Sequence, residues 1–118
     1  MTLSTHVLDA TTGRPAAGVE VRLDCAAGEG GGDAGWVPAG VGQTDADGRL
    51  RLSSHPGTGD FEPGVYRITF GTGAYFKARG AASFYPEVTI TFEMTERDEH
   101  YHVPLLLSPF AYSTYRGS

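Results

Sequence analysis

The sequence predicts an all-β fold, an antiparallel Greek-key β-sandwich that carries one short helix. Apolar and polar residues alternate with a period of two in several separate segments, as they do in strands that bury one face. Turn-forming residues separate these segments, and the 118 residues include 17 glycines and 7 prolines, whereas helix-forming runs are scarce. About eight strands at this spacing are typical of a sandwich.

Six segments show the strand pattern most clearly. In chain order they are Ser4–Asp9, Val19–Asp24, Leu50–Leu52, Val65–Phe70, Val88–Met94 and His100–Pro104. Turns are expected between them at Thr12–Pro15, Asp45–Gly48, Pro63–Gly64 and Glu96–Glu99. One segment breaks the pattern: Tyr75, Phe76 and Arg79 are at helical spacing between Thr72 and Gly80. This spacing, with a threonine at the start and a glycine at the end, predicts a helix of about two turns.

The remaining segments are expected to be loops. Gly28–Gly35 is rich in glycine and is expected to be a mobile loop, and His55 is expected to be a solvated loop residue beside Pro56 and Gly57. The segment Asp45–Gly48 resembles part of a calcium loop, but it lacks the distal glutamate and the flanking helices. We interpret it as a hairpin turn.

Length, charge and cysteine content limit the possible classes of protein. Residues 1–118 are expected to form a single domain that is long enough to bury a core. A net charge of −5 without lysine or arginine clusters argues against nucleic acid as a partner. No segment has the length of a membrane span or the pattern of a signal peptide, so we expect a cytoplasmic protein. Cys25 is the only cysteine, which excludes an internal disulfide.

Polar residues on the first and last predicted strands suggest a site. His6 lies on the face opposite Thr5 and Val7, and His100 and His102 share one face of the last strand. Arg49 begins another strand. If the first and last strands are neighbours, imidazoles and a guanidinium converge on one sheet surface. Histidine can accept and return protons near neutral pH, and arginine binds planar, oxygen-rich or anionic groups.

Two plainer interpretations stand beside this one. A histidine in a strand is more often a partly exposed surface residue than a catalyst. The His100–His102 spacing also fits a metal pair, but no third ligand with suitable spacing is evident, since Cys25 lies in an unrelated strand and Asp9 and Asp24 are isolated.

The C-terminal tetrapeptide Tyr115–Ser118 is unusual for a chain end. It follows the apolar stretch Val103–Leu107 and the aromatic residues Phe110 and Tyr112. A tail of this composition is expected to dock on the body of the protein, which would fix a phenol, an arginine, a serine hydroxyl and a carboxylate in one place.

Together these segments resemble the 5-hydroxyisourate hydrolase family, the enzymatic relatives of transthyretin. The resemblance extends over the whole chain, in order. It rests on Ser4–Asp9, Thr44–Arg49, Gly73–Phe76 with Phe84–Val88, and His102–Pro109 leading into Tyr115–Ser118. The terminal tetrapeptide is the most specific of these motifs.

The resemblance implies a transthyretin-like sandwich of two four-stranded sheets with one short helix. It also implies a homotetramer with active sites at the dimer–dimer interface. The reaction would be hydrolysis of 5-hydroxyisourate to the imidazoline carboxylate OHCU in the degradation of urate to allantoin, without a metal or organic cofactor. The implied catalytic residues are His6, Arg49, His102 and Ser118. The implied substrate-binding residues are His6, Arg49, Tyr115, Arg116 and Gly117.

Two other functions stay open. A transthyretin-like channel can carry aromatic ligands without catalysis, although two titratable imidazoles argue against a purely apolar channel. A structural sandwich module of a surface protein is the other alternative.

Overall fold

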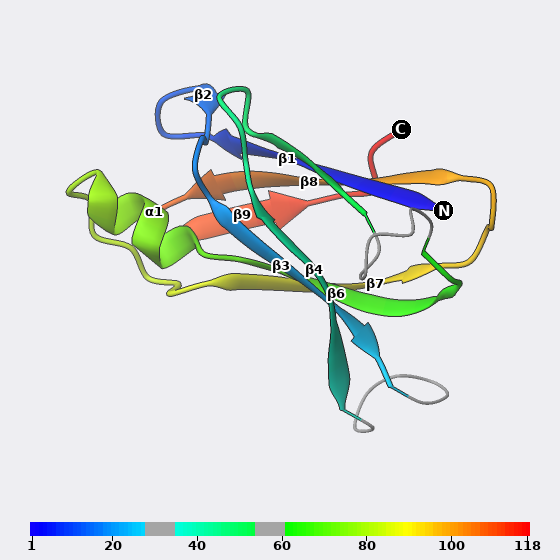
Figure 1. Cartoon of the computed structure of the whole chain (residues 1–118). Coiled ribbons are helices and arrows are strands. Elements are labelled where there is room, and N and C mark those ends of the chain that lie inside the picture. Colours follow the sequence, from blue (N-terminus) through cyan, green and yellow to red (C-terminus); the bar gives the residue numbers. More distant parts are fainter. Residues whose placement is uncertain (28–34, 54–60) are drawn as a thin grey trace.

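The computed structural model describes residues 1–27, 35–53 and 61–118. Figure 1 shows two layers of strands with a single helix at one end. The elements are β1 (Thr2–Asp9), β2 (Arg14–Pro15), β3 (Glu20–Ala26), β4 (Trp36–Gln43), β5 (Arg49–Leu52), β6 (Gly64–Phe70), α1 (Thr72–Ala78), β7 (Val88–Met94), β8 (His100–Ser108) and β9 (Ala111–Thr114). The expected mobile loop at Gly28–Gly35 and the expected position of His55 lie outside the described residues, apart from Gly35 itself.

The strands form two sheets, as expected. In the first sheet the order is β2-β1-β8-β9, and β5 pairs with β1 beside β2. The second sheet has the order β4-β3-β6-β7. Apart from the two-residue strand β2, each sheet therefore has four strands. Alternate residues of both sheets pack into one core, in which Leu3, Leu23 and Phe70 are among the fully buried side chains.

One strand pair differs from the antiparallel expectation. β1 and β8 run parallel, with Thr2 opposite His100 and Asp9 opposite Leu107. Parallel neighbours need a long crossover connection, and here the whole second sheet supplies it. The two strands that carry the candidate histidines are thus direct neighbours at the centre of the first sheet.

The helix forms where the sequence predicts it, but it begins differently. The capping position is Gly71, which has no side chain to cap with, and the buried Thr72 hydroxyl has no hydrogen-bond partner in the described chain. The expected threonine start is therefore not a side-chain cap. Tyr75 anchors the helix, because its hydroxyl donates to Asp9 Oδ2 at 2.9 Å. Gly80 follows with φ of 70°, which glycine adopts at little cost.

The turn at Asp45–Gly48 joins the two sheets. β4 pairs with β3 in the second sheet and β5 pairs with β1 in the first, so the turn does not close a hairpin of two paired strands. The prediction of a hairpin turn was wrong on this point, because a local turn signal says nothing about which sheet receives the next strand. In the described ranges, no helix is long and apolar enough to cross a membrane.

Candidate active site

The central strands of the first sheet bring the predicted histidines and arginine onto one outer face. The register places His6 opposite Arg49 of β5. It places Ser4 opposite His102 of β8 on the other side. Thr5 and Val7 point into the core and His6 is half-buried on the outside, as the alternation predicts. Side chains from three strands therefore meet on this face, which we call the histidine face (the outer side of β1, β5 and β8 around His6, Arg49 and His102).

A hollow of about 280 Å³ lies on the histidine face. Its polar lining consists of Ser4, Asp45, Arg49, Arg51 and His102, with part of Thr5 and Leu50. A volume of this size is near the lower limit for small-molecule pockets. It holds donors, an imidazole and a hydroxyl, which suits a small, planar ligand with several oxygens.

His102 is held by a hydroxyl and is kept neutral by its surroundings. Its Nδ1 atom is hydrogen-bonded to Ser4 Oγ at 2.8 Å. Burial lowers the pKa of His102 below its usual value of 6.5, and Arg49, His100 and His6 lower it further because a second positive charge close by is unfavourable. A neutral imidazole at pH 7 has a free lone pair and can accept a proton from water.

Arg49 is placed by the turn that precedes it. The backbone amides of Asp47 and Arg49 both donate to Asp45 Oδ1 at 2.9 Å, and the Asp45 amide donates to the Arg49 carbonyl. These bonds fix the backbone from which the guanidinium projects. In residues 1–27, 35–53 and 61–118 the Arg49 side chain takes part in no salt bridge. It is an exposed cation available to an anionic or carbonyl-rich ligand.

The chain end docks beside His102 through its backbone. The Gly117 amide donates to the His102 carbonyl at 2.9 Å, and the two residues form an antiparallel bridge. A Cβ atom at Gly117 would lie 2.5 Å from His102 Cδ2. Only glycine allows this close approach of the tail to the imidazole.

The side chains of the terminal tetrapeptide are not all gathered at the hollow. Arg116 donates to Glu99 Oε2 at 2.7 Å and lies 4.6 Å from the centre of the Tyr101 ring. Tyr115 and Ser118 are exposed. The expected docking of the tail therefore holds for its backbone, whereas its aromatic side chains face outward in the single chain.

Sequence reasoning gave no role to Ser4. Its hydroxyl is hydrogen-bonded to both His102 Nδ1 and His100 Nε2, each at 2.8 Å. The signal was present in part, because Ser4 shares a face with His6. The missing information was the parallel register, which alone places Ser4 beside the two histidines.

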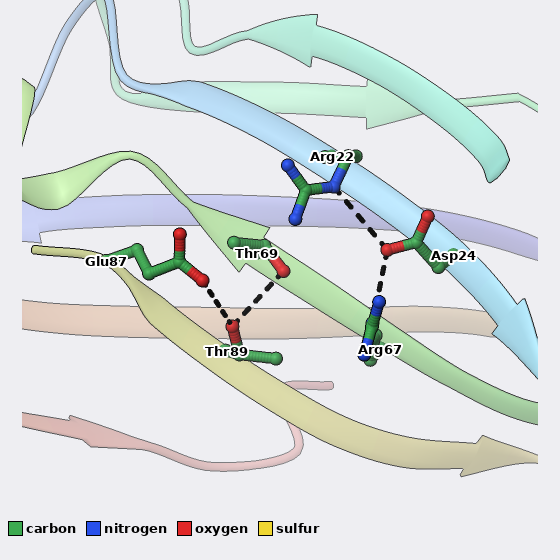
Figure 2. A network of polar contacts seen from close by, with 6 residues as sticks. All are labelled: Arg22, Asp24, Arg67, Thr69, Glu87 and Thr89. Atoms are coloured by element: carbon green, nitrogen blue, oxygen red, sulfur yellow. Dashed lines mark hydrogen bonds and ion pairs between the residues drawn. The ribbon is translucent and has the colours of Figure 1, made fainter. Parts of the chain in front are cut away.

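The outer face of the second sheet carries a larger hollow of about 620 Å³ and a different set of polar residues. Figure 2 shows a polar network on this face that includes Arg22, Thr69 and Glu87 of the hollow's lining. The buried carboxylate of Asp24 contacts Arg22 at 3.5 Å and Arg67 at 3.2 Å, and Arg67 also stacks on Trp36. The Thr89 hydroxyl lies 3.2 Å from Thr69 Oγ1. Arg22 in the lining of the larger hollow is thus paired, and the carboxylates Glu20 and Glu87, which also line it, do not suit an anionic ligand.

The described residues contain no cluster of three or more histidine, cysteine, aspartate or glutamate side chains with metal-binding geometry. Asp9 and Asp24, which the sequence suggested were isolated, have hydrogen-bond partners of their own in Tyr75 and Arg67. His100 and His102 share the Ser4 hydroxyl between them.

Comparison with known proteins gives a consistent result. The profile of the HIUase/Transthyretin family matches residues 3–117. A curated 5-hydroxyisourate hydrolase of Salmonella typhimurium is 47% identical over 116 residues, covering 98% of this chain and 80% of that protein. The structure of Klebsiella pneumoniae 5-hydroxyisourate hydrolase matches with a TM-score of 0.82 and 37% identity, covering 100% of both chains. Sea bream transthyretin in complex with thyroxine matches with a TM-score of 0.84 and 34% identity, covering 98% of this chain and 93% of the other.

Proposed function

This chain belongs to the HIUase/Transthyretin family, and on that premise we propose that it hydrolyses 5-hydroxyisourate to OHCU in the degradation of urate to allantoin. The observation that carries the proposal is the convergence of His6, Arg49 and His102 on one sheet face, where Arg49 and His102 line the hollow and His6 lies beside them. Relatives named as 5-hydroxyisourate hydrolases support the substrate, and the side chains on the histidine face supply the groups that the reaction needs.

The proposed mechanism gives each residue a separate task. Arg49 binds the carbonyl-rich, readily anionic ring and holds a carbonyl oxygen. The neutral imidazole of His102 accepts a proton from the attacking water, which its lowered pKa favours at pH 7. His6 returns a proton to the leaving ring nitrogen. The oxyanion that develops at the carbonyl is stabilised by Arg49 or by the hydroxyl of Ser118.

The terminal tetrapeptide completes the site in this proposal. Gly117 brings the backbone of the chain end against His102, and in the single chain Tyr115 and Arg116 line a neighbouring hollow that shares His102. Tyr115 positions the substrate by its ring edge and phenol, and Arg116 and Gly117 contribute to binding. The Arg116–Glu99 ion pair is exposed, so breaking it costs little free energy. Arg116 can therefore leave Glu99 and contact the substrate instead.

We further propose that the reaction is a cyclic-amide hydrolysis that needs no metal. Arg49 supplies the positive charge that a metal would otherwise place at the carbonyl oxygen, and His102 supplies the base. Activity that survives extensive dialysis against EDTA supports this step, and activity lost to EDTA and restored by a divalent cation contradicts it.

The proposed assembly is a homotetramer with active sites at the dimer–dimer interface. Four large aromatic residues are exposed in the single chain: Phe84 at 70%, Phe110 at 67%, Tyr112 at 41% and Tyr115 at 60%. An exposed set of this size favours burial against other copies. Sedimentation equilibrium at micromolar concentration should give about four chains, and a fully active monomer would contradict the assembly. The cytoplasmic location expected from the sequence stays a prediction, which cell fractionation tests.

Ultraviolet absorbance provides the decisive test of function. Urate oxidase generates 5-hydroxyisourate in situ, and its decay is followed with and without this protein. The same experiment should also measure thyroxine binding, which tests the carrier alternative. The fold resembles a thyroxine-bound transthyretin as closely as it resembles a hydrolase. Thyroxine binding with an unchanged decay rate would favour a carrier over an enzyme.

A further inference from the structure

A chain of hydrogen bonds runs from His102 to the edge of the first sheet. Ser4 Oγ lies 2.8 Å from His102 Nδ1 and 2.8 Å from His100 Nε2. The other ring nitrogen of His100, Nδ1, contacts Thr2 Oγ1. His102 is half-buried and His100 is exposed, so the chain leads from the hollow to solvent.

The parallel pairing of β1 and β8 creates this arrangement. Thr2 and Ser4 lie opposite His100 and His102, so side chains two residues apart on each strand alternate along the same face. Ser4 is the link between the two imidazoles, because a serine hydroxyl accepts from one ring while it donates to the other.

We propose that Ser4 and His100 form a proton relay that carries the proton taken up by His102 out to solvent. The proposal rests on the proposed hydrolase function. Hydrolysis of a neutral ring amide adds the oxygen of water to the carbonyl carbon and sends one proton to the leaving nitrogen. The proton of the new carboxyl group recharges His6, which has protonated the nitrogen, so the proton that His102 took from water has to leave the site in each turnover.

The relay conserves every proton it handles. His102 accepts the water proton at Nε2 and passes the proton of Nδ1 to Ser4 Oγ. Ser4 passes its own hydroxyl hydrogen to His100 Nε2, which leaves the serine neutral. His100 then releases its Nδ1 proton toward Thr2 Oγ1 and the bulk buffer. Both rings end neutral and in their other tautomer, with the proton on Nε2.

The charges around His102 fit an outward transfer. Arg49 of β5, His6 of β1 and His100 of β8 all disfavour a charged His102, and the tail residue Gly117 brings no charged side chain. A proton that moves from the half-buried ring to the exposed ring escapes both burial and the Arg49 cation. Ser4 is in this scheme a positioning residue and a conduit, since it does not contact the substrate carbonyl.

Steady-state kinetics of the assembled protein test the relay through kcat in dilute and concentrated imidazole buffer. The variants are S4A, S4T and H100N, with S108A as matched control, because among the described residues the Ser108 hydroxyl donates to the Ala111 carbonyl in its own turn and contacts neither histidine. We expect S4A and H100N to lose roughly 10²-fold in kcat in dilute buffer with little change in KM, the lower range for general acid–base groups.

The pattern of rescue separates a relay from a structural role. Concentrated imidazole should restore the kcat of H100N, because this variant interrupts the relay at its solvent end. It should not restore the kcat of S4A, which interrupts the relay inside the hollow. S4T keeps a hydroxyl and should retain most of kcat. Wild-type kcat in S4A, or an H100N loss that no buffer restores, overturns the relay.

Nuclear magnetic resonance separates failure of the relay from failure of the proposed function. If the wild-type protein does not hydrolyse 5-hydroxyisourate, the function fails, yet the ¹⁵N shifts of His102 still report its tautomer. The relay predicts that H100N changes these shifts only when Ser4 is present. Identical His102 shifts in wild type and H100N would overturn the coupling whatever the activity.

Discussion

The two outer faces of the sandwich both carry charged side chains, but the charges are arranged differently. On the second sheet, Asp24 lies between Arg22 and Arg67, so both guanidinium groups have a carboxylate partner within the face. On the histidine face, His6, Arg49 and His102 form no salt bridge among the described residues. A self-neutralised face stabilises a fold, whereas a face whose charges lack counterions can bind a substrate and transfer protons.

The largest expected effect separates the faces by activity. H6A or H102A should lower kcat by about two to four orders of magnitude, because each removes a group that we propose as general acid or base. T89V on the second sheet removes the hydroxyl that pairs with Thr69 and should leave kcat unchanged. The ultraviolet assay measures both, and circular dichroism checks that each variant is folded. Equal kcat values for H102A and T89V would remove the distinction between the faces.

A variant at the chain end should lower kcat by a smaller amount, through a displacement on the histidine face. G117A places a methyl group 2.5 Å from His102 Cδ2, so the ring or the tail has to move. Because a displacement of about 1 Å can cost about 10²-fold in rate, we expect a loss of that order in kcat. G64A is the control, since its added Cβ meets nothing nearer than Tyr66 at 3.9 Å. Wild-type turnover in G117A would mean that the tail does not constrain His102.

Changing the second sheet should affect stability instead. D24N removes the charge that Arg22 and Arg67 share, and we expect the free energy of unfolding to fall by about 1–3 kcal/mol. The exposed Arg22 contributes the smaller part, because water screens its pair. Urea denaturation measures the change, with D98N at an exposed carboxylate as control. A D24N variant with normal stability and reduced kcat would reverse the assignment of the two faces.

The smallest expected effect is a shift in titration. The pKa of His102 lies below 6.5, so the base form, and with it hydrolysis, should persist below that pH and decline only as pH falls through the lowered pKa. Because Arg49 is among the groups that lower this pKa, R49Q should raise it. Titration of the His102 ring by magnetic resonance should show an upward shift in R49Q. R22Q on the second sheet should leave it unchanged, and a downward shift in R49Q would contradict the proximity of the two groups.

Local sequence pattern was sufficient for the strands that bury one face and for the short helix. It failed for β4, whose Pro38, Gly40 and Gly42 interrupt the alternation, and for the short β9. Both are edge strands, where irregular backbone and proline are tolerated. Edge strands pair on one side only, so their sequence is less constrained.

In the candidate site, too, some features could be predicted from local sequence and others could not. His6, Arg49 and His102 could be found from residue type and alternation, and the terminal tetrapeptide from its composition. The contact of Ser4 with both histidines could not, because it depends on the register between strands that are 98 residues apart in the chain. The orientation of Arg116 toward Glu99 likewise depends on tertiary packing.

The parallel pairing of β1 with β8 also has a consequence for how the protein is made. The second sheet uses residues from within the interval 20–94, so its strands can associate before β8 leaves the ribosome. One edge of β1 can pair early with β2 and β5, but its other edge has to wait for β8 from the far end of the polypeptide, and closing so large a loop is entropically costly and slow. During synthesis, the strand that carries His6 and Ser4 therefore exposes unpaired backbone N–H and C=O groups along the edge that later receives β8, until translation is almost complete. Chaperone dependence and co-translational aggregation should concentrate on this N-terminal segment rather than on the more local second sheet.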